Sequence, residues 1–220
     1  MKDNRDNMYL KDTYAAGEIE DKYKAQMEAE KQEEQRRKEK RENRIEWIKD
    51  IIIAIIIAVV IMQFVRPTIV RQSSMEPNFY EGHYLLLSKQ AYGLFGNEPD
   101  YGQIVVFESE LADENGNDKL LIKRVIGKPG DEITLSGGYV YRNGEKIDEP
   151  YIHMQGETWS PYGSDITCVV PEGEYFLMGD HREVSVDSRW EEVGTVPLDQ
   201  FQGRVFLRLY PFNQIESFKK

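Results

Sequence analysis

The sequence predicts a mainly β fold, a barrel or a folded sheet, that follows one transmembrane helix and a polar N-terminal tail. From residue 103 onward, short runs rich in β-branched and aromatic residues alternate with turn signals such as PGD (129–131) and NG (143–144). No helix-length amphipathic stretch separates these runs, which argues against a fold that alternates strands with helices. Residues 51–65, by contrast, contain no charged side chain and predict a helix in an apolar environment.

Residues 1–44 predict a cytoplasmic charged tail that is solvated and partly helical or disordered. Residues 1–50 hold 13 Lys+Arg and 14 Asp+Glu, and residues 51–220 hold 15 Lys+Arg and 25 Asp+Glu. Nearly all of the net charge of −11 therefore lies in residues 51–220. This acidic balance argues against a nucleic-acid partner. The apolar positions Ile19, Tyr23 and Met27 are not continued in register, so a coiled coil is not expected.

Residues 45–65 predict a transmembrane signal anchor. The uncharged residues 51–65 cover only about 22 Å of helix, less than the roughly 30 Å of a bilayer's hydrocarbon core, so residues 45–50 are needed as well. Trp47 suits the interface, and Lys49 can extend its charge toward water. A buried core helix is less favoured because no comparable apolar helix follows for it to pack against. A cleaved signal peptide is less favoured because the region before the apolar segment is too long. The basic residues before the span place the N-terminus in the cytoplasm.

Residues 66–220 predict one extracytoplasmic β-rich domain. Its clearest hairpin is YVYRNGEKI (139–147), in which Asn143-Gly144 forms a typical two-residue turn. The single cysteine, Cys168, excludes an internal disulfide and is expected to pack as a small apolar residue. The predicted strand regions are QIVVFES (103–109), KLLIKRVIG (119–127), DEITLSGGYVYRNGEKI (131–147), TCVVPEGEYFLMGD (167–180) and GRVFLRLYPF (203–212).

Few arrangements of chemically active residues are present in this domain. It has no HExxH motif, no phosphate-binding glycine loop and no GxSxG motif. His83, His153 and His181 are scattered without metal-ligand spacing and are expected to be surface or hydrogen-bonding residues. A serine and a lysine therefore remain as candidates.

Ser74 and Lys123 are the candidate nucleophile and base. Ser74 follows the extended segment RPTIVRQS and lies shortly before Pro77, which disfavours helix at the residue that precedes it. Lys123 lies within the apolar strand LLIKRVIG, where strand alternation places it on one face with Leu121 and Val125. Such a lysine commonly marks an edge strand or extends to solvent. If it is buried, its pKa falls and its neutral amine can accept the serine proton.

A third stretch, MGDHREVSVDSRW (178–190), alone predicts a polar loop closed by ion pairs. In combination, SSMEP (73–77), GQIVVF (102–107), KRVIGKPGD (123–131) and GDHREVSVDSR (179–189) follow the apolar segment in this order and resemble bacterial type I signal peptidases. The resemblance implies coiled antiparallel β-sheets and a membrane-bound serine endopeptidase. Such enzymes remove signal peptides from exported preproteins at the outer face of the cytoplasmic membrane, without metal or cofactor.

The resemblance implies a role for each matching residue. Ser74 is the expected nucleophile, Lys123 the general base, and Ser185 the residue whose hydroxyl holds the lysine toward Ser74. Ser74 attacks the substrate carbonyl to form an acyl-enzyme, which water then hydrolyses. Two structural ion pairs are also implied, and they are Asp187–Arg189 and Asp180–Arg124.

The resemblance also implies how the substrate is bound. Segments 68–73 and 119–123 flank the site as strands, and the signal peptide pairs with them as an added strand. The Ser74 N–H and the Gln72 side chain are the expected oxyanion donors. Shallow pockets accept small side chains one and three residues before the cut, and the expected lining residues are Val70, Met75, Phe79, Leu121 and Ile122.

Three positions depart from the family's usual pattern. Asn78 and Phe79 follow Pro77 where Thr-Leu is usual, and His181 stands where asparagine is common. Gln72 occupies a position that supplies an oxyanion-binding hydroxyl in some members, so its side-chain amide is expected to replace that donor.

Three other functions stay open from the sequence. A different serine hydrolase would use Ser74 with His181 and Asp187, although this leaves the lysine strand without a role. SOS-repressor autoproteases share Ser-Lys chemistry, but they carry a DNA-binding domain and lack a membrane span. A catalytically inactive, membrane-anchored binding module would not need Ser74, Lys123 and Ser185 together. We expect a monomer whose partners are preproteins and the lipid bilayer, and not nucleic acid.

Overall fold

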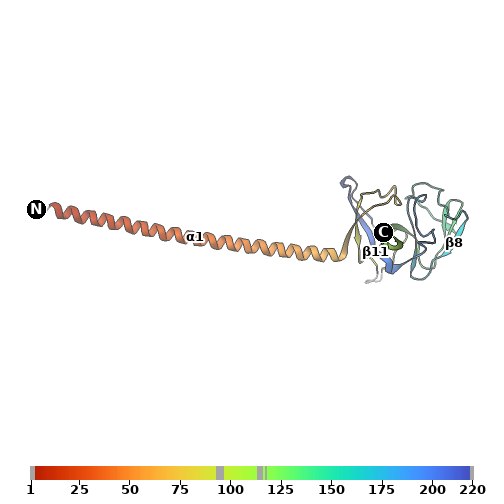
Figure 1. The fold of residues 1–220 in the computed structure, drawn as a ribbon, viewed down its shortest axis with the longest axis horizontal. Coiled ribbons are helices and arrows are strands. Elements are labelled where there is room, and N and C mark those ends of the chain that lie inside the picture. Colours follow the sequence, from red (N-terminus) through yellow and green to blue (C-terminus); the bar gives the residue numbers. More distant parts are fainter. Residues whose placement is uncertain (1–2, 93–96, 113–115, 117, 219–220) are drawn as a thin grey trace. The chain divides into compact units, whose positions relative to one another are not determined.

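The computed structural model describes residues 3–92, 97–112, 116 and 118–218. The chain divides into two compact units, Met1–Val59 and Val60–Lys220. The helix α1 (Asp3–Phe64) makes up the first unit and continues into the second. Figure 1 shows α1 as one uninterrupted helix.

The first part of α1 differs from the sequence-based expectation. The sequence predicts a partly helical or disordered tail before residue 45, whereas the structure has helix from Asp3 onward. Glutamates four residues before a cation, in the pairs Glu33–Arg37 (2.6 Å) and Glu34–Lys38 (3.0 Å), give the helix local support. No helix in the described part of the chain has the length and apolar character needed to cross a membrane.

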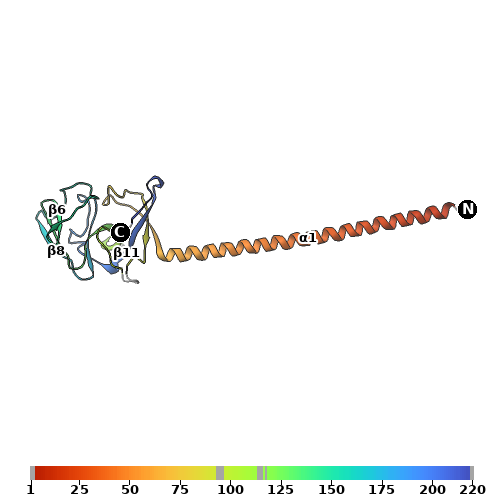
Figure 2. The same cartoon turned by 180° about the vertical axis from the view of Figure 1, so that it is seen from behind.

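The second unit is mainly antiparallel β structure, as the sequence predicts. In its larger sheet the strands lie in the order β1-β2-β11-β3-β4-β9-β10, and β12 also pairs with β11. Figure 2 shows β6 and β8 of the smaller sheet on one side of this unit and β11 on the other. The strands of the larger sheet are β1 (Val65–Ile69), β2 (Tyr84–Ser88), β3 (Ile104–Ala112), β4 (Asp118–Gly127), β9 (Glu174–Met178), β10 (Val196–Pro197), β11 (Phe201–Tyr210) and β12 (Glu216–Ser217).

The smaller sheet contains the hairpin that the sequence predicts. Its strand order is β7-β6-β5-β8. Asn143 and Gly144 join β6 to β7 with φ angles of 54° and 82°, the left-handed values that a tight hairpin turn requires. The strands are β5 (Glu132–Ser136), β6 (Tyr139–Arg142), β7 (Glu145–Lys146) and β8 (Ile166–Val169), and two short 3₁₀ helices elsewhere are η1 (Leu198–Gln200) and η2 (Phe212–Gln214).

Every predicted strand region contains strand, but the sequence does not predict β2. Its segment YLLLS has three leucines and no β-branched residue, so local propensity does not indicate a strand. The structure places β2 between β1 and β11, where Leu85 and Leu87 are buried. Burial against neighbouring strands therefore decides the conformation of this segment.

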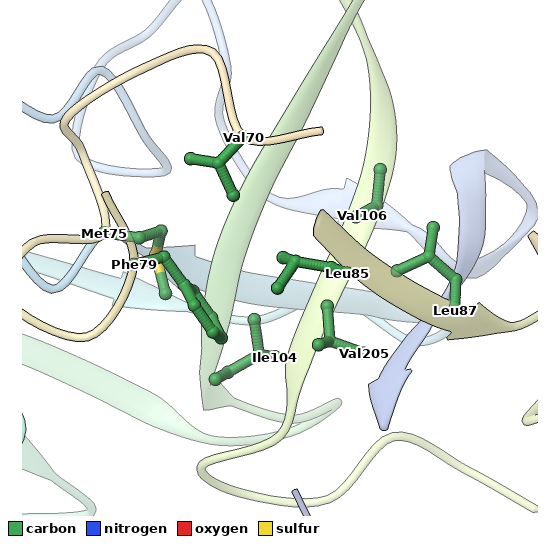
Figure 3. Packing of buried hydrophobic residues seen from close by; sticks show 8 residues of the cluster. All are labelled: Val70, Met75, Phe79, Leu85, Leu87, Ile104, Val106 and Val205. Atoms are coloured by element: carbon green, nitrogen blue, oxygen red, sulfur yellow. The ribbon is translucent and has the colours of Figure 1, made fainter. Parts of the chain in front are cut away.

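The first of three core clusters supports the segment that carries Ser74. Figure 3 shows the cluster, in which the ring of Phe79 points toward Ile104. Phe79 is fully buried, and burying a side chain of this size is worth about 1.5–3 kcal/mol. The turn between β1 and β2 is therefore anchored to β2, β3 and β11. The cluster consists of Val70, Met75, Phe79, Leu85, Leu87, Ile104, Val106 and Val205.

Candidate active site

Ser74 lies in the turn that follows β1, and contacts on both sides fix this turn. Met75 and Phe79 are buried in the core, and the Phe79 N–H donates to the Met75 carbonyl at 2.8 Å. The Ser74 carbonyl accepts a hydrogen bond of 3.0 Å from the His181 N–H, which ties the turn to the loop after β9. Ser74 itself is 8% exposed, so its hydroxyl is held at the edge of the interior.

Lys123 reaches Ser74 from the middle of β4. Its Nζ lies 2.8 Å from Ser74 Oγ, which is hydrogen-bond distance. The side chain is 1% exposed, and its strand neighbours Leu121 and Val125 belong to the second core cluster. Burial of the ammonium lowers the pKa of Lys123 from 10.5 to about 8, although the charge of Asp187 acts in the opposite direction. The amine is therefore substantially neutral at mildly alkaline pH and can accept a proton.

Gly179 follows β9 directly and separates Ser74 from Ser185. A Cβ atom on Gly179 would lie 2.5 Å from the Ser74 carbonyl oxygen and 2.2 Å from Ser185 Oγ, so a side chain has no room there. The Gly179 N–H donates to Asp187 Oδ2 at 3.0 Å. Ser185 is 2% exposed, and its hydroxyl has no hydrogen-bond partner of ordinary geometry among the described residues. The glycine thus lets the loop that carries Ser185 come close to Ser74.

Two buried ion pairs hold the segments around the site. Arg189 Nε donates to Asp187 Oδ1 at 2.8 Å, and Arg124 Nη2 donates to Asp180 Oδ2 at 2.7 Å. Arg189 also donates to the Ser185 carbonyl at 3.2 Å, which closes the loop. Burial acts to raise the pKa of Asp187, but the charge and hydrogen bonds of Arg189 outweigh burial and lower it. Asp187 is therefore held as a carboxylate.

A cleft of about 390 Å³ opens beside Ser74 and Lys123, and one of its walls is a strand edge. In the described ladder, β9 pairs with β4 only from Arg124 to Gly127, whereas β3 pairs with β4 from Asp118 to Arg124. The preceding part of β4 is thus available along the cleft. The lining mixes apolar, polar and charged side chains, and its members are Arg71, Gln72, Ser73, Ser74, Glu76, Glu81, Leu111, Lys119, Leu121, Lys123, Val184 and Val186.

Comparison with known proteins identifies the family of this chain. The family model described as signal peptidase, peptidase S26, matches residues 44–210. The chain belongs to this family. Signal peptidase IB of Staphylococcus aureus (strain COL) is 34% identical over 186 residues, which cover 78% of this chain and 92% of the relative. Signal peptidase I of Bacillus licheniformis is 33% identical over 178 residues, covering 78% and 91%.

A crystal structure of a signal peptidase I from Enterococcus faecalis V583 is also similar in sequence. It is 30% identical to this chain and covers 49% of it and 97% of the solved chain, with a TM-score of 0.40. The family model and the two relatives establish the signal peptidase family, and the roles of individual residues rest on the geometry of the site.

The structure brings together most of the residues that the signal peptidase pattern selects. Ser74, Lys123 and Gln72 line one cleft, and Gln72 is exposed there. Ser185 approaches from the loop after β9 across Gly179. Both expected ion pairs are present, and they are Asp187–Arg189 and Asp180–Arg124.

The structure corrects the expected lining of the substrate pockets. Leu121 lines the cleft as expected. Val70, Met75 and Phe79 instead lie in the first core cluster, each at most 2% exposed, and Ile122 packs against the same cluster. The expectation follows closeness in sequence to Ser74 and Lys123. The turn, however, directs Val70, Met75 and Phe79 toward β2, β3 and β11 rather than toward the cleft, and Ile122 faces the same cluster from β4.

Two residues that support the site were not expected from the sequence. Position 179 requires glycine because Ser74 and Ser185 approach the backbone too closely for a side chain. The one sequence signal for this residue is its place at the start of the GDHREVSVDSR motif. Asn78 donates to Asp180 Oδ2 at 2.8 Å and to the Tyr151 carbonyl at 2.6 Å. The departure from the signal peptidase pattern at position 78 therefore provides a further partner for the Asp180 carboxylate.

The alternative arrangement of Ser74 with His181 and Asp187 is not supported. Among the contacts between described residues, none joins the His181 imidazole to Ser74 Oγ or to Asp187. The imidazole instead faces Glu183, with Nε2 3.5 Å from the carboxylate. Asp187 is bound by Arg189.

Proposed function

We propose that the protein removes N-terminal signal peptides from exported preproteins, with Ser74 as nucleophile and Lys123 as general base. The observation that carries the proposal is the 2.8 Å separation of Lys123 Nζ and Ser74 Oγ at a lysine that is 1% exposed. The substrate class comes from the relatives, which are named signal peptidases.

The chemistry follows from a buried amine beside a hydroxyl. Neutral Lys123 accepts the Ser74 proton while Ser74 Oγ attacks the carbonyl carbon of the scissile bond. The resulting ammonium gives the proton to the leaving amine, which leaves the acyl group on Ser74. Water then loses a proton to Lys123, attacks the ester and releases the free signal peptide and Ser74. The lowered pKa lets one amine serve as base and acid near neutral pH.

Two donors are available for the oxyanion. No hydrogen bond among those described uses the Ser74 N–H, so this N–H is free to donate to a substrate oxygen. The Gln72 side chain lines the same cleft, and we assign it the second donor position. A donor that is held in place before the reaction, as the Ser74 N–H is, is worth about 3–4 kcal/mol of transition-state stabilisation.

Ser185 is the proposed positioning residue for Lys123. Its hydroxyl is buried beside the Ser74 carbonyl, makes no hydrogen bond of ordinary geometry to a described residue, and interacts with the Asp187 carboxylate. A hydroxyl can donate one hydrogen bond and accept others, so Ser185 can donate toward Asp187 while its oxygen accepts from the Lys123 amine. Such a bond would restrict the amine to the side that faces Ser74.

The strand edge along the cleft supports binding of an extended substrate. The signal peptide would pair with residues 119–123 on one side and with the segment 68–73 on the other. Apolar Leu121, Val184 and Val186 line the cleft, which suits small apolar side chains one and three residues before the cut.

We propose, on the sequence pattern and although no described helix meets the length and apolar requirement of a full span, attachment to the cytoplasmic membrane through residues 45–65, with the charged tail 1–44 inside and the catalytic domain 66–220 outside. Residues 51–64 carry no charge, yet large apolar side chains along this part of α1 are exposed. Such a surface is stabilised by lipid. Attachment would confine the enzyme and its membrane-bound substrates to one surface and raise their effective concentration. All proposed site residues come from one chain, so a monomer suffices.

Cleavage of a purified preprotein by the full-length protein in detergent tests this function. Wild type should release a product that begins at the signal-peptide junction, as mass spectrometry would show. The variants Ser74→Ala and Lys123→Ala should release no product. The matched controls Lys146→Ala and Ser217→Ala change exposed residues outside the cleft and should cleave like wild type. Cleavage that persists in Lys123→Ala and disappears in His181→Ala would refute the dyad.

Extraction of cell membranes with alkaline carbonate would separately test the anchor, which requires the protein to stay with lipid.

A further inference from the structure

Two histidines that are far apart in the sequence lie against each other next to the turn that carries Ser74. The rings of His153 and His181 have centroids 4.3 Å apart and are tilted by 35°. Glu183 faces both rings: its Oε2 lies 3.4 Å from His153 Nδ1 and 3.5 Å from His181 Nε2. One nitrogen or oxygen atom from each residue lies within 4.8 Å of the other two.

These separations fit ligands of one metal ion better than they fit hydrogen bonds. Hydrogen bonds between nitrogen and oxygen usually measure about 2.7–3.2 Å, and both distances to Glu183 are longer. Ligands at about 2.0–2.1 Å from a tetrahedral zinc ion are separated from one another by about 3.3 Å. The Glu183 oxygen is therefore spaced from each ring nitrogen as two ligands of such a site are, and one ligand atom from each of the three residues lies within 4.8 Å of the others.

The second nitrogen of His181 gives an independent indication. His181 Nδ1 is buried and has no hydrogen-bond partner among the described residues. The carboxylate of Glu76 lies 4.0 Å from it. Histidines that bind a metal through one nitrogen commonly donate the other N–H to a carboxylate, which orients the ring. At 4.0 Å Glu76 does not bind this nitrogen in the structure, but a shift of about 1 Å would bring it to the position of that outer carboxylate.

The backbone holds the two histidines in place without help from their side chains. The His153 N–H donates to the Asp180 carbonyl at 3.0 Å, and the His181 N–H donates to the Ser74 carbonyl at 3.0 Å. The side chains of His153 and Glu183 are 41% and 42% exposed, so an ion and a water ligand can reach them. The ligand positions are thus largely formed in the folded chain and open to solvent.

We propose that His153, His181 and Glu183 form a binding site for a divalent transition-metal ion such as Zn²⁺, with water as a fourth ligand and Glu76 as the outer partner of His181. Two imidazoles and one carboxylate favour zinc and its neighbours over calcium or magnesium, which prefer oxygen ligands. Glu76 also lines the catalytic cleft, so the metal site and the cleft share a residue. The proposal goes beyond the peptidase function and does not depend on it.

Direct metal binding tests the proposal, because it can be measured without any cleavage assay. The full-length protein in detergent, free of a histidine tag, would compete for Zn²⁺ with a chromogenic chelator of micromolar affinity. Wild type should bind one ion per chain, and Co²⁺ should give the visible absorption of a four-coordinate site. His153→Ala and Glu183→Gln should each weaken binding at least about tenfold, and Glu76→Gln should weaken it about tenfold as the outer carboxylate.

The controls separate this site from other carboxylates of an acidic chain. Glu192→Gln removes an exposed carboxylate outside the cluster and should bind Zn²⁺ like wild type. Near-ultraviolet circular dichroism would show that each variant keeps its fold, and His181→Ala provides a second histidine variant should His153→Ala not fold. The proposal is overturned if wild type does not compete with the chelator, or if folded His153→Ala and His181→Ala bind Zn²⁺ with unchanged affinity.

Discussion

The two faces of β4 carry adjacent buried cations in opposite situations. Arg124 is 9% exposed and binds both oxygens of Asp180, at 2.8 and 2.7 Å, and the Gly102 carbonyl at 2.8 Å. Lys123 is 1% exposed, and its described hydrogen bond is to the neutral hydroxyl of Ser74. Burial is similar on the two faces, but only the guanidinium has a carboxylate in direct contact.

The difference shows how one strand combines a structural charge with a reactive amine. A guanidinium stays protonated in proteins, so Arg124 needs the fixed counter-charge that Asp180 provides. An ammonium can lose its proton, and the pKa of Lys123 falls to about 8 because burial is not offset by a bonded carboxylate. Similar burial therefore accompanies a paired charge on one face and favours a neutral amine on the other.

The largest effect should come from removing the amine. Lys123→Met keeps the apolar stem of the side chain but has no base, so peptide cleavage should fall at least about 1,000-fold. Lys123→Arg should be inactive as well, because a guanidinium cannot become neutral. Rates of preprotein cleavage at saturating substrate would measure both changes. Substantial activity in Lys123→Arg would contradict the role of a neutral amine and erase the contrast between the two faces.

Removing the cation from the other face should affect folding first. Arg124→Met leaves the Asp180 carboxylate buried with less compensation, and the free energy of unfolding should fall by about 3–5 kcal/mol. Denaturant unfolding followed by tryptophan fluorescence would measure it. The double variant Arg124→Met/Asp180→Leu should recover much of the loss, because no buried charge remains unpaired. If the double variant is no more stable than the single one, the pair does not act as inferred.

The pH dependence should reflect the lowered pKa of Lys123. Between about pH 8 and 10.5 the unfolded chain holds the lysine proton and the folded chain does not, so stability should rise with pH across this window. The rise should be about 3 kcal/mol and should be absent from Lys123→Met, since each pKa unit corresponds to 1.36 kcal/mol. The ratio kcat/KM should also rise with pH and level off above about 8. A flat profile for both quantities would mean that the lysine is not the titrating group.

Adding a methyl group at Gly179, between Ser74 and Ser185, should disturb the site around Lys123 and leave the Arg124 ion pair unchanged. Gly179→Ala places Cβ 2.2 Å from Ser185 Oγ, and such overpacking typically costs about 1–3 kcal/mol. Gly127→Ala is the matched control within β4, since its Cβ would meet Ile133 Cγ1 at 2.9 Å, away from the cleft. We expect both variants to lose stability, as thermal unfolding would show. Only Gly179→Ala should also lose activity per folded molecule, and equal losses would argue against a special role for the loop of Ser185.

The contrast between the faces also marks what the sequence can predict. The alternation of side chains along LLIKRVIG correctly places Lys123 and Arg124 on opposite faces of β4. Each strand region that the sequence predicts between turn signals contains strand in the structure. The continuous helix before residue 45 is not predicted, because charged residues are compatible with both a helix and a solvated tail.

Site residues are predictable where a motif carries them and not where the fold assembles them. SSMEP and KRVIGKPGD lead to Ser74 and Lys123, and the structure places these residues 2.8 Å apart. The directions of Met75 and Phe79 depend on how the turn meets the core, which local sequence does not encode. The contact of His153 with His181 likewise arises because the His153 N–H binds the Asp180 carbonyl, a tertiary contact.

The smallest effect should come from Gln72, whose exposed amide contrasts with the buried amine beside it. A donor contributes fully only when it is held in position before the reaction, as a backbone N–H is. An exposed side chain must be ordered first, so Gln72→Ala should lower kcat by less than about tenfold, with KM nearly unchanged. Steady-state kinetics on a short signal-peptide substrate would measure both constants. A loss of 100-fold or more would show that substrate binding fixes Gln72, and that a flexible residue at the cleft can match the preorganised dyad in importance.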